Sequence, residues 1–92
     1  MVYVDPLIKC RPCPRWPYPT ACHLVADSVE ELHGFARRLG MRREWFQNRR
    51  GLPHYDLTAG RRDAAVRLGA VEIATDELVG RIRRAALRQT GG

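Results

Sequence analysis

The stretch Cys22-His23-Leu24-Val25-Ala26-Asp27-Ser28 decides the fold, because it joins an aliphatic run directly to the start of a helix. Residues 23–26 predict a short buried strand. Ser28 and Glu31 have the spacing of a capping box, which marks a helix start. Apolar residues then recur along one helical face: Val29, Leu32, Ala36 and Leu39. Gly40 ends this helix, so the stretch predicts one strand followed by one helix.

The same alternation of strand and helix continues on both sides of this stretch. Residues 2–4 and 70–73 predict two further buried strands, and residues 59–68 predict a second helix that Thr58 caps. Thr75-Asp76-Glu77 starts a third helix, whose acidic first turn and basic later turns suit the helix dipole. We therefore expect an α/β (or α+β) fold, with a three- to four-stranded sheet packed by about three helices.

The domain organisation is simple, because residues 1–92 are enough for one small domain. Five prolines between residues 6 and 21 block regular structure, so residues 6–21 predict a Pro/Cys-rich loop. Residues 41–47 predict a short helix or turn, and residues 48–53 predict a polar loop. Residues 89–92 end in two glycines and predict a frayed tail.

The charge balance is basic and depends almost entirely on arginine. The chain has 16 Lys and Arg against 10 Asp and Glu, a net charge of +6, and Lys9 is its single lysine. Guanidinium groups bind phosphate in a bidentate way, which favours a nucleic acid or nucleotide ligand. A genome rich in G and C would produce the same composition without such a ligand. Because we find neither a membrane-spanning run nor a secretion leader, we expect a cytoplasmic protein that does not bind membranes.

Polar side chains are densest in Leu52-Pro53-His54-Tyr55-Asp56-Leu57-Thr58, which we expect to be a loop that runs into a helix. His54 could act as a general base or a metal ligand, and Asp56 could orient its ring. Asp5 directly follows the first predicted strand and is a third candidate. The predicted catalytic residues are therefore His54, Asp56 and Asp5.

A metal site is predicted where the first two strands end. If those strands are parallel neighbours, Asp5 and Asp27 meet at the same edge of the sheet. Together with His23, they could hold Mg²⁺ or Mn²⁺. A helix cap also explains Asp27, and we favour that role because an N-cap position needs a side-chain oxygen.

Two groups of arginines are candidates for binding phosphate. Arg61 and Arg62 lie in the first turn of the helix after residues 52–58, where guanidinium groups and a helix amino end would converge on an anion. They are the predicted phosphate-binding residues. Other arginine pairs flank Trp45 and Phe46, a pattern that suits single-stranded nucleic acid but also a solvated face with Phe46 in the core.

The three cysteines are an odd number, which speaks against a disulfide framework. Cys10 and Cys13 form a C-x-x-C pair, and with Cys22 they could bind Zn²⁺ if a distant histidine supplied the fourth ligand. Cys22 and His23 are adjacent on a predicted strand and point to opposite faces, so they would not easily share one metal. Cys10, Cys13 and Cys22 are thus an alternative zinc site.

Several short sequence motifs of this chain, in this order, resemble those of one small family of bacterial and phage proteins, domain of unknown function 4031. They include Val2-Tyr3-Val4-Asp5, His23-Leu24-Val25-Ala26-Asp27-Ser28 and Pro53-His54-Tyr55-Asp56-Leu57-Thr58. The resemblance covers nearly the whole chain and implies that these polar residues belong to the family pattern, without implying an activity. The loop that carries Cys10 and Cys13 departs from the pattern, which weakens zinc as a cofactor of the whole family.

Two functions follow from these features. The leading hypothesis is a small basic protein with a His/Asp/Arg site that binds a phosphate-bearing ligand, either a nucleic acid or a nucleotide, and could perform metal-assisted hydrolysis. The alternative is a non-catalytic interaction module, a phage or host accessory protein, which binds a protein or a nucleic acid and could be stabilised by zinc. A catalytic site should open to a cleft, whereas internal struts should be buried and mutually hydrogen-bonded.

Overall fold

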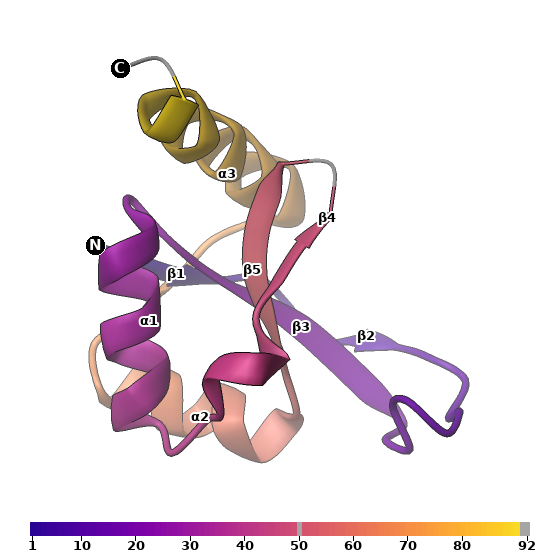
Figure 1. The fold of residues 1–92 in the computed structure, drawn as a ribbon. Helices are drawn as coiled ribbons and strands as arrows, with labels where there is room; N and C mark the ends of the chain where they lie inside the picture. Colours follow the sequence, from indigo (N-terminus) through magenta and orange to yellow (C-terminus); the bar gives the residue numbers. More distant parts are fainter. Residues whose placement is uncertain (50, 91–92) are drawn as a thin grey trace.

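Residues 1–49 and 51–90 are described by a computed structural model, with side chains described for residues 1–48 and 51–84. Over this part of the chain, three α-helices and one 3-10 helix accompany six strands (Figure 1). The elements follow in this order: β1 (Val2–Val4), β2 (Ile8–Lys9), β3 (Thr20–Ala26), α1 (Val29–Arg38), the 3-10 helix η1 (Arg43–Trp45), β4 (Gln47–Arg49), β5 (Leu52–Leu57), α2 (Ala59–Arg67), β6 (Val71–Glu72) and α3 (Thr75–Thr90). The fold is therefore α+β, with more strands than the three or four expected.

The sheet is mixed, and its strands lie in the order β4-β5-β3-β1-β6, with β2 paired to the start of β3. β3 is antiparallel to both β1 and β5, whereas β1 and β6 are parallel. The condition on which Asp5 and Asp27 would meet, a parallel pairing of the first two predicted strands, is therefore not fulfilled. A parallel pair needs a long crossover, usually a helix, and the proline-rich segment between β1 and β3 contains none.

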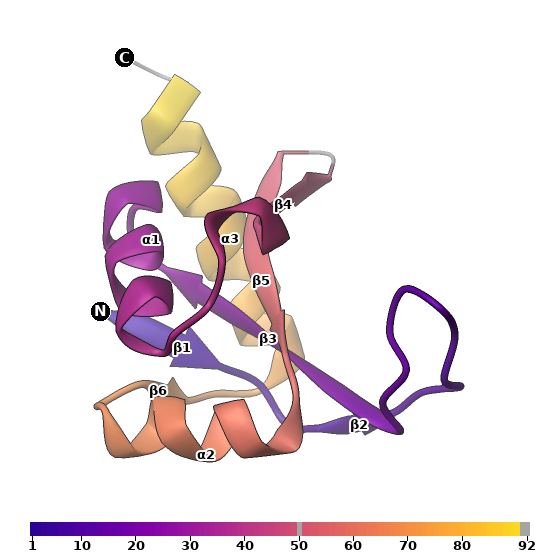
Figure 2. The ribbon, with the colours of Figure 1, turned by 60° about the horizontal axis from the view of Figure 1, so that its bottom comes forward.

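The two faces of the sheet are covered by different helices. On one face, buried side chains of the sheet pack against α1 and α2, and they include Val4, Leu24, Tyr55 and Leu57. On the other face, Tyr3 and Val25 pack with Leu78 and Ile82 of α3. Figures 1 and 2 show α3 apart from α1 and α2. Because side chains alternate along a strand, neighbouring residues of one strand contact different helices.

The helix predicted from the capping box is confirmed as α1. Ser28 has an extended backbone, and its Oγ accepts a hydrogen bond of 3.1 Å from the backbone N–H of Glu31. The buried face of the helix consists of Leu32, Phe35 and Ala36. Gly40 follows the helix with a φ of +76°, a left-handed conformation that glycine adopts without strain.

Three segments that we expected to be loops contain strands. Residues 52–57 form β5, in which Pro53, Tyr55 and Leu57 are buried and alternate with partly exposed residues. Residues 8–9 form β2 within the expected Pro/Cys-rich loop, and β4 lies at the edge of the expected polar loop. Pairing with β3 or β5 satisfies the backbone of each segment, and this tertiary effect is not visible in local composition.

β2 and the chain that follows it, residues 8–19, form an arm that projects from the body of the fold (Figures 1 and 2). At its base, the backbone N–H of Cys10 donates to the carbonyl of Pro19 at 2.9 Å. Farther out, Cys13 and Trp16 form an isolated antiparallel bridge. The prolines fall between these paired residues, so the arm keeps a defined course without forming a longer strand.

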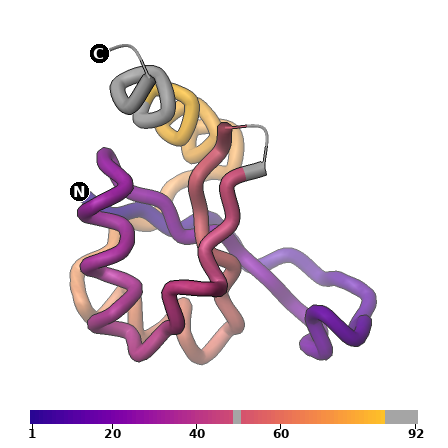
Figure 3. The backbone as a smooth tube through the Cα atoms, viewed as in Figure 1, coloured from indigo at the N-terminus to yellow at the C-terminus, as the bar shows by residue number. Residues whose placement is uncertain are grey.

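The last element of the described chain is α3, and Figure 3 traces the backbone that leads into it. Residues 89 and 90, which we expected to fray, are helical, and residues 91–92 of the expected tail lie outside the described residues. Among the helices that the structure describes, none has both the length and the apolar character needed to cross a membrane.

His33 of α1 is wedged between aromatic rings at the edge of the core. Its Nδ1 lies 2.8 Å from the hydroxyl of Tyr55, and its ring meets that of Phe46 edge to face at 4.6 Å. Its Nε2 is buried and has no hydrogen-bond partner among the described residues. Burial lowers the pKa of His33 below its usual value, and the nearby charge of Arg43 acts in the same direction. The fold therefore favours the neutral imidazole.

We expect His33 to make the domain less stable in mild acid. Its pKa is lower in the folded than in the unfolded chain, so the unfolded chain binds more protons once the pH falls through the usual value of 6.5. His33 makes its full contribution to the free energy of unfolding above pH 6.5, and this contribution is lost as the pH falls below that value. Urea unfolding of the wild type and of His33→Gln should show a smaller loss in the variant between about pH 7.5 and pH 5.5. Equal losses in the two proteins would contradict this role, because all other titrating groups are shared.

Candidate functional site

The strand register brings four polar side chains to the face of the sheet that α3 partly covers. His23 of β3 pairs directly with Asp56 of β5, and His54 lies two residues before Asp56 on the same face. Asp5 comes directly after β1, next to Val4, which pairs with Leu24. We call Asp5, His23, His54 and Asp56 the His/Asp cluster. Tyr55, the middle residue of the His-Tyr-Asp word, points to the opposite face and is buried.

Three members of this cluster direct ligand atoms toward one another. Asp56 Oδ1 lies 3.6 Å from His54 Nε2 and 4.0 Å from His23 Nε2. Among the described residues, His23, His54 and Asp56 are the single group of three or more His, Cys, Asp or Glu side chains whose ligand atoms all lie within 4.8 Å of one another. All three residues are partly exposed, so an ion from solvent could reach this trio.

A backbone contact determines that Nδ1 of His54 carries a hydrogen. Its Nδ1 lies 2.8 Å from the carbonyl oxygen of Leu52. Because a carbonyl only accepts hydrogen bonds, Nδ1 must carry a hydrogen. In the neutral ring, Nε2 therefore has a free electron pair, and it is Nε2 that faces Asp56.

The ring of His23 is held in the same way by a buried carboxylate. Its Nδ1 lies 2.9 Å from Asp5 Oδ2, and Asp5 also accepts hydrogen bonds from the backbone N–H of His23 at 2.7 Å and from the Thr75 hydroxyl at 3.0 Å. Asp5 is only 1% exposed. Burial alone would raise the pKa of Asp5, but the hydrogen bonds from His23 and Thr75 outweigh it and lower that pKa. Asp5 is thus an ionised acceptor that fixes the ring of His23 and leaves Nε2 directed at Asp56.

The same contact makes His23 a stronger base. The hydrogen bond to Asp5 raises the pKa of His23, burial opposes this, and the charges of Asp5 and Asp56 add to the increase. A cation that binds Nε2 therefore competes with a proton more strongly than it would at an unperturbed histidine.

Gln47 of β4 supports Asp56 and was not among the predicted site residues. Its Nε2 donates a short hydrogen bond to Asp56 Oδ2, which leaves Oδ1 for the two imidazoles. Gln47 pairs with His54 across β4 and β5, so its side chain shares their face. Only a correct strand assignment for residues 47–57 would have revealed it.

The donor set of the trio suits a first-row transition metal. Two imidazoles and one carboxylate are typical ligands of Zn²⁺, Mn²⁺ and Fe²⁺, whereas Mg²⁺ prefers oxygen ligands alone. Tetrahedral bonds of about 2.0–2.1 Å would place ligand atoms roughly 3.3 Å apart. The separations of 3.6 and 4.0 Å are slightly wider, so small side-chain rotations would close the site around an ion. The hydrogen bonds that the two histidines donate to Asp5 and to the Leu52 carbonyl match those that orient metal-binding histidines.

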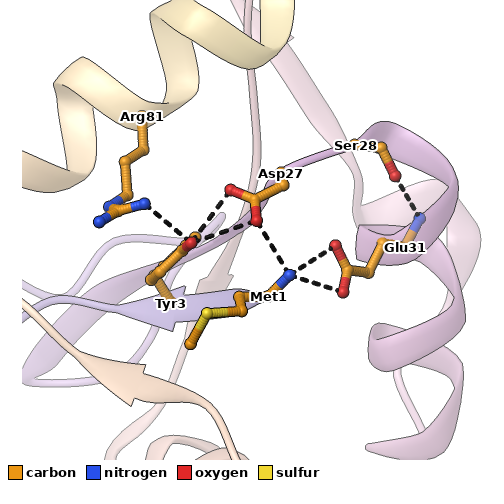
Figure 4. Close-up of polar contacts among 6 residues, drawn as sticks. All are labelled: Met1, Tyr3, Asp27, Ser28, Glu31 and Arg81. Atoms are coloured by element: carbon orange, nitrogen blue, oxygen red, sulfur yellow. Dashed lines mark hydrogen bonds and ion pairs between the residues drawn. The ribbon is translucent and has the colours of Figure 1, made fainter.

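Asp27 lies beside Met1 (Figure 4), which places it at the opposite end of β1 from Asp5. The Tyr3 hydroxyl donates to the Asp27 carboxylate at 3.0 Å and accepts a hydrogen bond of 2.8 Å from Arg81. The antiparallel arrangement of β1 and β3 separates the two aspartates that a parallel pair would have brought together. Asp27 is therefore not part of the predicted metal site with Asp5.

Asp27 also does not cap α1, contrary to the role we favoured for it. Ser28 fills that position, as its hydrogen bond to Glu31 shows (Figure 4). The Asp27 carboxylate instead pairs with the amino group of Met1 at 3.0 Å, and Glu31 pairs with the same group at 2.9 Å. These contacts tie β1 to the start of α1.

Arg61 and Arg62 are both engaged with the fold. Arg62 Nε donates to the backbone carbonyl of Asp5 at 2.8 Å, and its Nη1 lies 3.0 Å from the Glu72 carboxylate. Arg61 Nη1 donates to the carbonyl of Leu39 at 2.7 Å. Arg62 thus joins α2 to the sheet behind the His/Asp cluster, and phosphate binding by either arginine stays a prediction.

The three cysteines do not form a metal site with one another. None of the described groups with metal-binding spacing contains Cys10, Cys13 or Cys22. Cys22 is buried in the core, and burial raises the pKa of its thiol to about 12, with the charge of Asp5 adding to the increase. A thiol with so high a pKa is a poor metal ligand, because metals bind the thiolate. The alternative zinc site is therefore not supported by the arrangement of these residues.

A pocket of about 390 Å³ opens beside the His/Asp cluster. Its walls are residues 15–18 of the arm, η1 with its neighbours, and the junction of β5 with α2. Asp56 and Gln47 line this pocket and also belong to the trio and its support, so the pocket adjoins the trio through these two residues.

Comparison with known protein families places the chain in one of them. Residues 2–85 match the family described as Protein of unknown function (DUF4031). The chain belongs to this family. The match includes every residue of the His/Asp cluster and all the residues that line the pocket. It confirms the resemblance noted in the sequence. None of the curated proteins and none of the solved structures matches the chain.

Proposed function

We propose that this protein is a metal-dependent hydrolase of phosphate-bearing ligands, with a divalent transition metal bound by His23, His54 and Asp56. The proposal rests on one observation. In each of these side chains, one nitrogen or oxygen is hydrogen-bonded to a partner, and the other is left to bind a metal ion. The partners are Asp5 for His23, the Leu52 carbonyl for His54, and Gln47 for Asp56. Such outer partners are the usual companions of metal-binding histidines and carboxylates.

The roles of the residues follow from their positions. His23, His54 and Asp56 would be the ligands, and a metal held by three protein ligands keeps a coordination position open for water or substrate. A metal in such a site supplies hydroxide at neutral pH and polarises a phosphoryl oxygen. Asp5 would orient His23 rather than bind the ion, because it is buried behind the ring. This assigns His54 to the metal in place of the general-base role.

The preference for phosphate rests on charge. The net charge of +6 attracts anions, and the pocket next to Asp56 is lined by Arg15 and Arg61. Arginine is well suited to the oxygens of a phosphate group. A nucleotide or a nucleic acid is the natural ligand class for such a site.

Metal binding and hydrolysis can be tested on the purified chain after chelator treatment and removal of the chelator. We expect one Zn²⁺ or Mn²⁺ per chain, a higher melting temperature when the metal is bound, and metal-dependent cleavage of a chromogenic phosphodiester. Mg²⁺ should bind much more weakly. Asp63→Asn, which removes an exposed carboxylate of α2, is the matched control and should behave like the wild type. A chain that binds none of these metals would overturn the proposal.

The non-catalytic interaction module is the second candidate, and the exposed arm favours it. Ile8 of the arm is 54% exposed, and Leu7 directly before it is 38% exposed, so the two adjacent residues form a small apolar surface that a partner could cover. Stoichiometric Zn²⁺ binding that stabilises the fold, without hydrolysis of any phosphate ester, would favour this module and contradict the hydrolase.

A further inference from the structure

The pocket beside the trio is unusually rich in exposed aromatic surface. Trp45 is 43% exposed and Tyr18 is 44% exposed, and both line the pocket together with Trp16. Tyr18 and Trp16 meet edge to face at 5.0 Å on the arm, whereas Trp45 lies on η1. Partly exposed aromatic side chains on two sides of one pocket are typical of sites that stack flat ligands.

Hydrogen bonds and stacking fix these walls before any ligand arrives. Trp16 Nε1 donates to the carbonyl of Thr20 at 3.0 Å, which holds the indole against the base of the arm. The guanidinium of Arg61 lies 5.5 Å from the centre of the Trp45 ring and is anchored to the carbonyl of Leu39. A preorganised wall loses little side-chain entropy when a ligand binds.

The pocket is lined by charged residues of both signs. Arg15 and Arg61 are its basic residues, and none of the described residues forms an ion pair with Arg15. Glu44, one of its two acidic residues, pairs with Arg42 at 3.3 Å. Asp56 lies where the pocket meets the trio, and a bound metal would offset its charge there.

We infer that this pocket binds the base of a nucleoside phosphate and directs its phosphate toward His23, His54 and Asp56. The base would stack on Trp45 and on the aromatic wall of the arm, and Arg15 would contact the phosphate. The phosphate end of this inference rests on the proposed metal site, whereas the base end does not. A volume of about 390 Å³ is within the range of small-molecule sites, so the pocket suits one unpaired base and not a base pair within a duplex.

The chain contains its own reporter for this inference. It has two tryptophans, Trp16 and Trp45, and both line the pocket. Quenching of tryptophan fluorescence therefore measures binding at this site directly. The probes are adenosine, adenosine 5′-monophosphate, ribose 5-phosphate, a short single-stranded oligonucleotide and its duplex, each with chelator and with Zn²⁺.

We expect adenosine to quench the fluorescence without metal, and adenosine 5′-monophosphate to bind more tightly when Zn²⁺ is present. Trp45→Leu, measured through the fluorescence of Trp16, should weaken binding by at least about fivefold. This is the lower end of the effect expected when one base loses its stacking partner. Trp16→Leu, followed through Trp45, should do the same, and Arg15→Ala should weaken the phosphate-bearing probes only. Arg67→Ala, an exposed arginine on α2, is the matched control.

The outcomes separate this inference from the proposed function. If ribose 5-phosphate binds as well as adenosine 5′-monophosphate and both tryptophan variants bind normally, the base site is wrong even though Zn²⁺ still binds. If adenosine binds but Zn²⁺ does not, the metal site is wrong and the base site stands. A single-stranded probe that binds far more tightly than the mononucleotide would identify nucleic acid as the source of the base, and tighter binding of the duplex would contradict the inference.

Discussion

Replacing His54 with alanine is expected to lower the affinity for Zn²⁺ by more than about 100-fold, because changes to outer partners alone typically cost 10- to 100-fold. The variant removes one of three ligands and leaves His23 and Asp56 with an incomplete site. Metal-dependent hydrolysis should fall to the background rate. Competition with a chromogenic chelator measures the affinity, and the phosphodiester assay measures the rate.

The fold should survive this change, because His54 lies on the partly exposed face of β5 and contributes one hydrogen bond, to Leu52. We expect a loss of about 1 kcal/mol in the free energy of unfolding. Asp5→Asn provides a milder comparison, since it keeps all three metal ligands but changes the hydrogen-bond partner of His23. It should lower the affinity for Zn²⁺ by roughly 10- to 100-fold. An unfolded His54→Ala would make this histidine structural, and a folded variant with normal Zn²⁺ affinity would exclude His54 as a ligand.

Replacing Tyr55 with alanine should be the most destabilising single change near the site. Tyr55 is 1% exposed, packs in the core under α1, and its hydroxyl contacts His33 Nδ1 at 2.8 Å. Truncating a buried aromatic residue typically costs about 3–5 kcal/mol. A domain of this size has a total stability of roughly 5–15 kcal/mol, so much of the stability would be lost. Urea unfolding monitored by circular dichroism measures the change.

Tyr55→Phe separates packing from chemistry. It keeps the ring and removes the hydroxyl, which leaves His33 Nδ1 without its partner, and it should cost about 1–3 kcal/mol. Because Tyr55 faces away from His54 and Asp56, this variant should bind Zn²⁺ and cleave phosphodiesters like the wild type. A large loss of activity in Tyr55→Phe would assign the phenol to the site, against the side-chain alternation of β5.

The helices could be predicted well because their signals are local. The capping pair Ser28 and Glu31 and the apolar stripe after it lie within one helix, and Thr58 likewise caps α2 by accepting from the N–H of Arg61. Strands were harder to predict, since β2 lies in a proline-rich segment, β5 contains Pro53, and both pair with β3, which is distant in the sequence from β5. In β5, the alternation of Pro53, Tyr55 and Leu57 was visible in the sequence, but the dense polar residues between them suggested a loop.

The sequence by itself determined most of the candidates for the site. His23, His54, Asp56 and Asp5 stand out as polar side chains at the ends of apolar runs or between them. The tertiary structure decided which of them meet. Because β1 and β3 are antiparallel, Asp27 lies at the opposite end of β1 from Asp5. The strand register pairs His23 with Asp56 and places Gln47 next to Asp56. The physical reason is that spacing along one chain fixes contacts only within a helix or strand, whereas contacts between strands depend on pairing that distant residues select through burial.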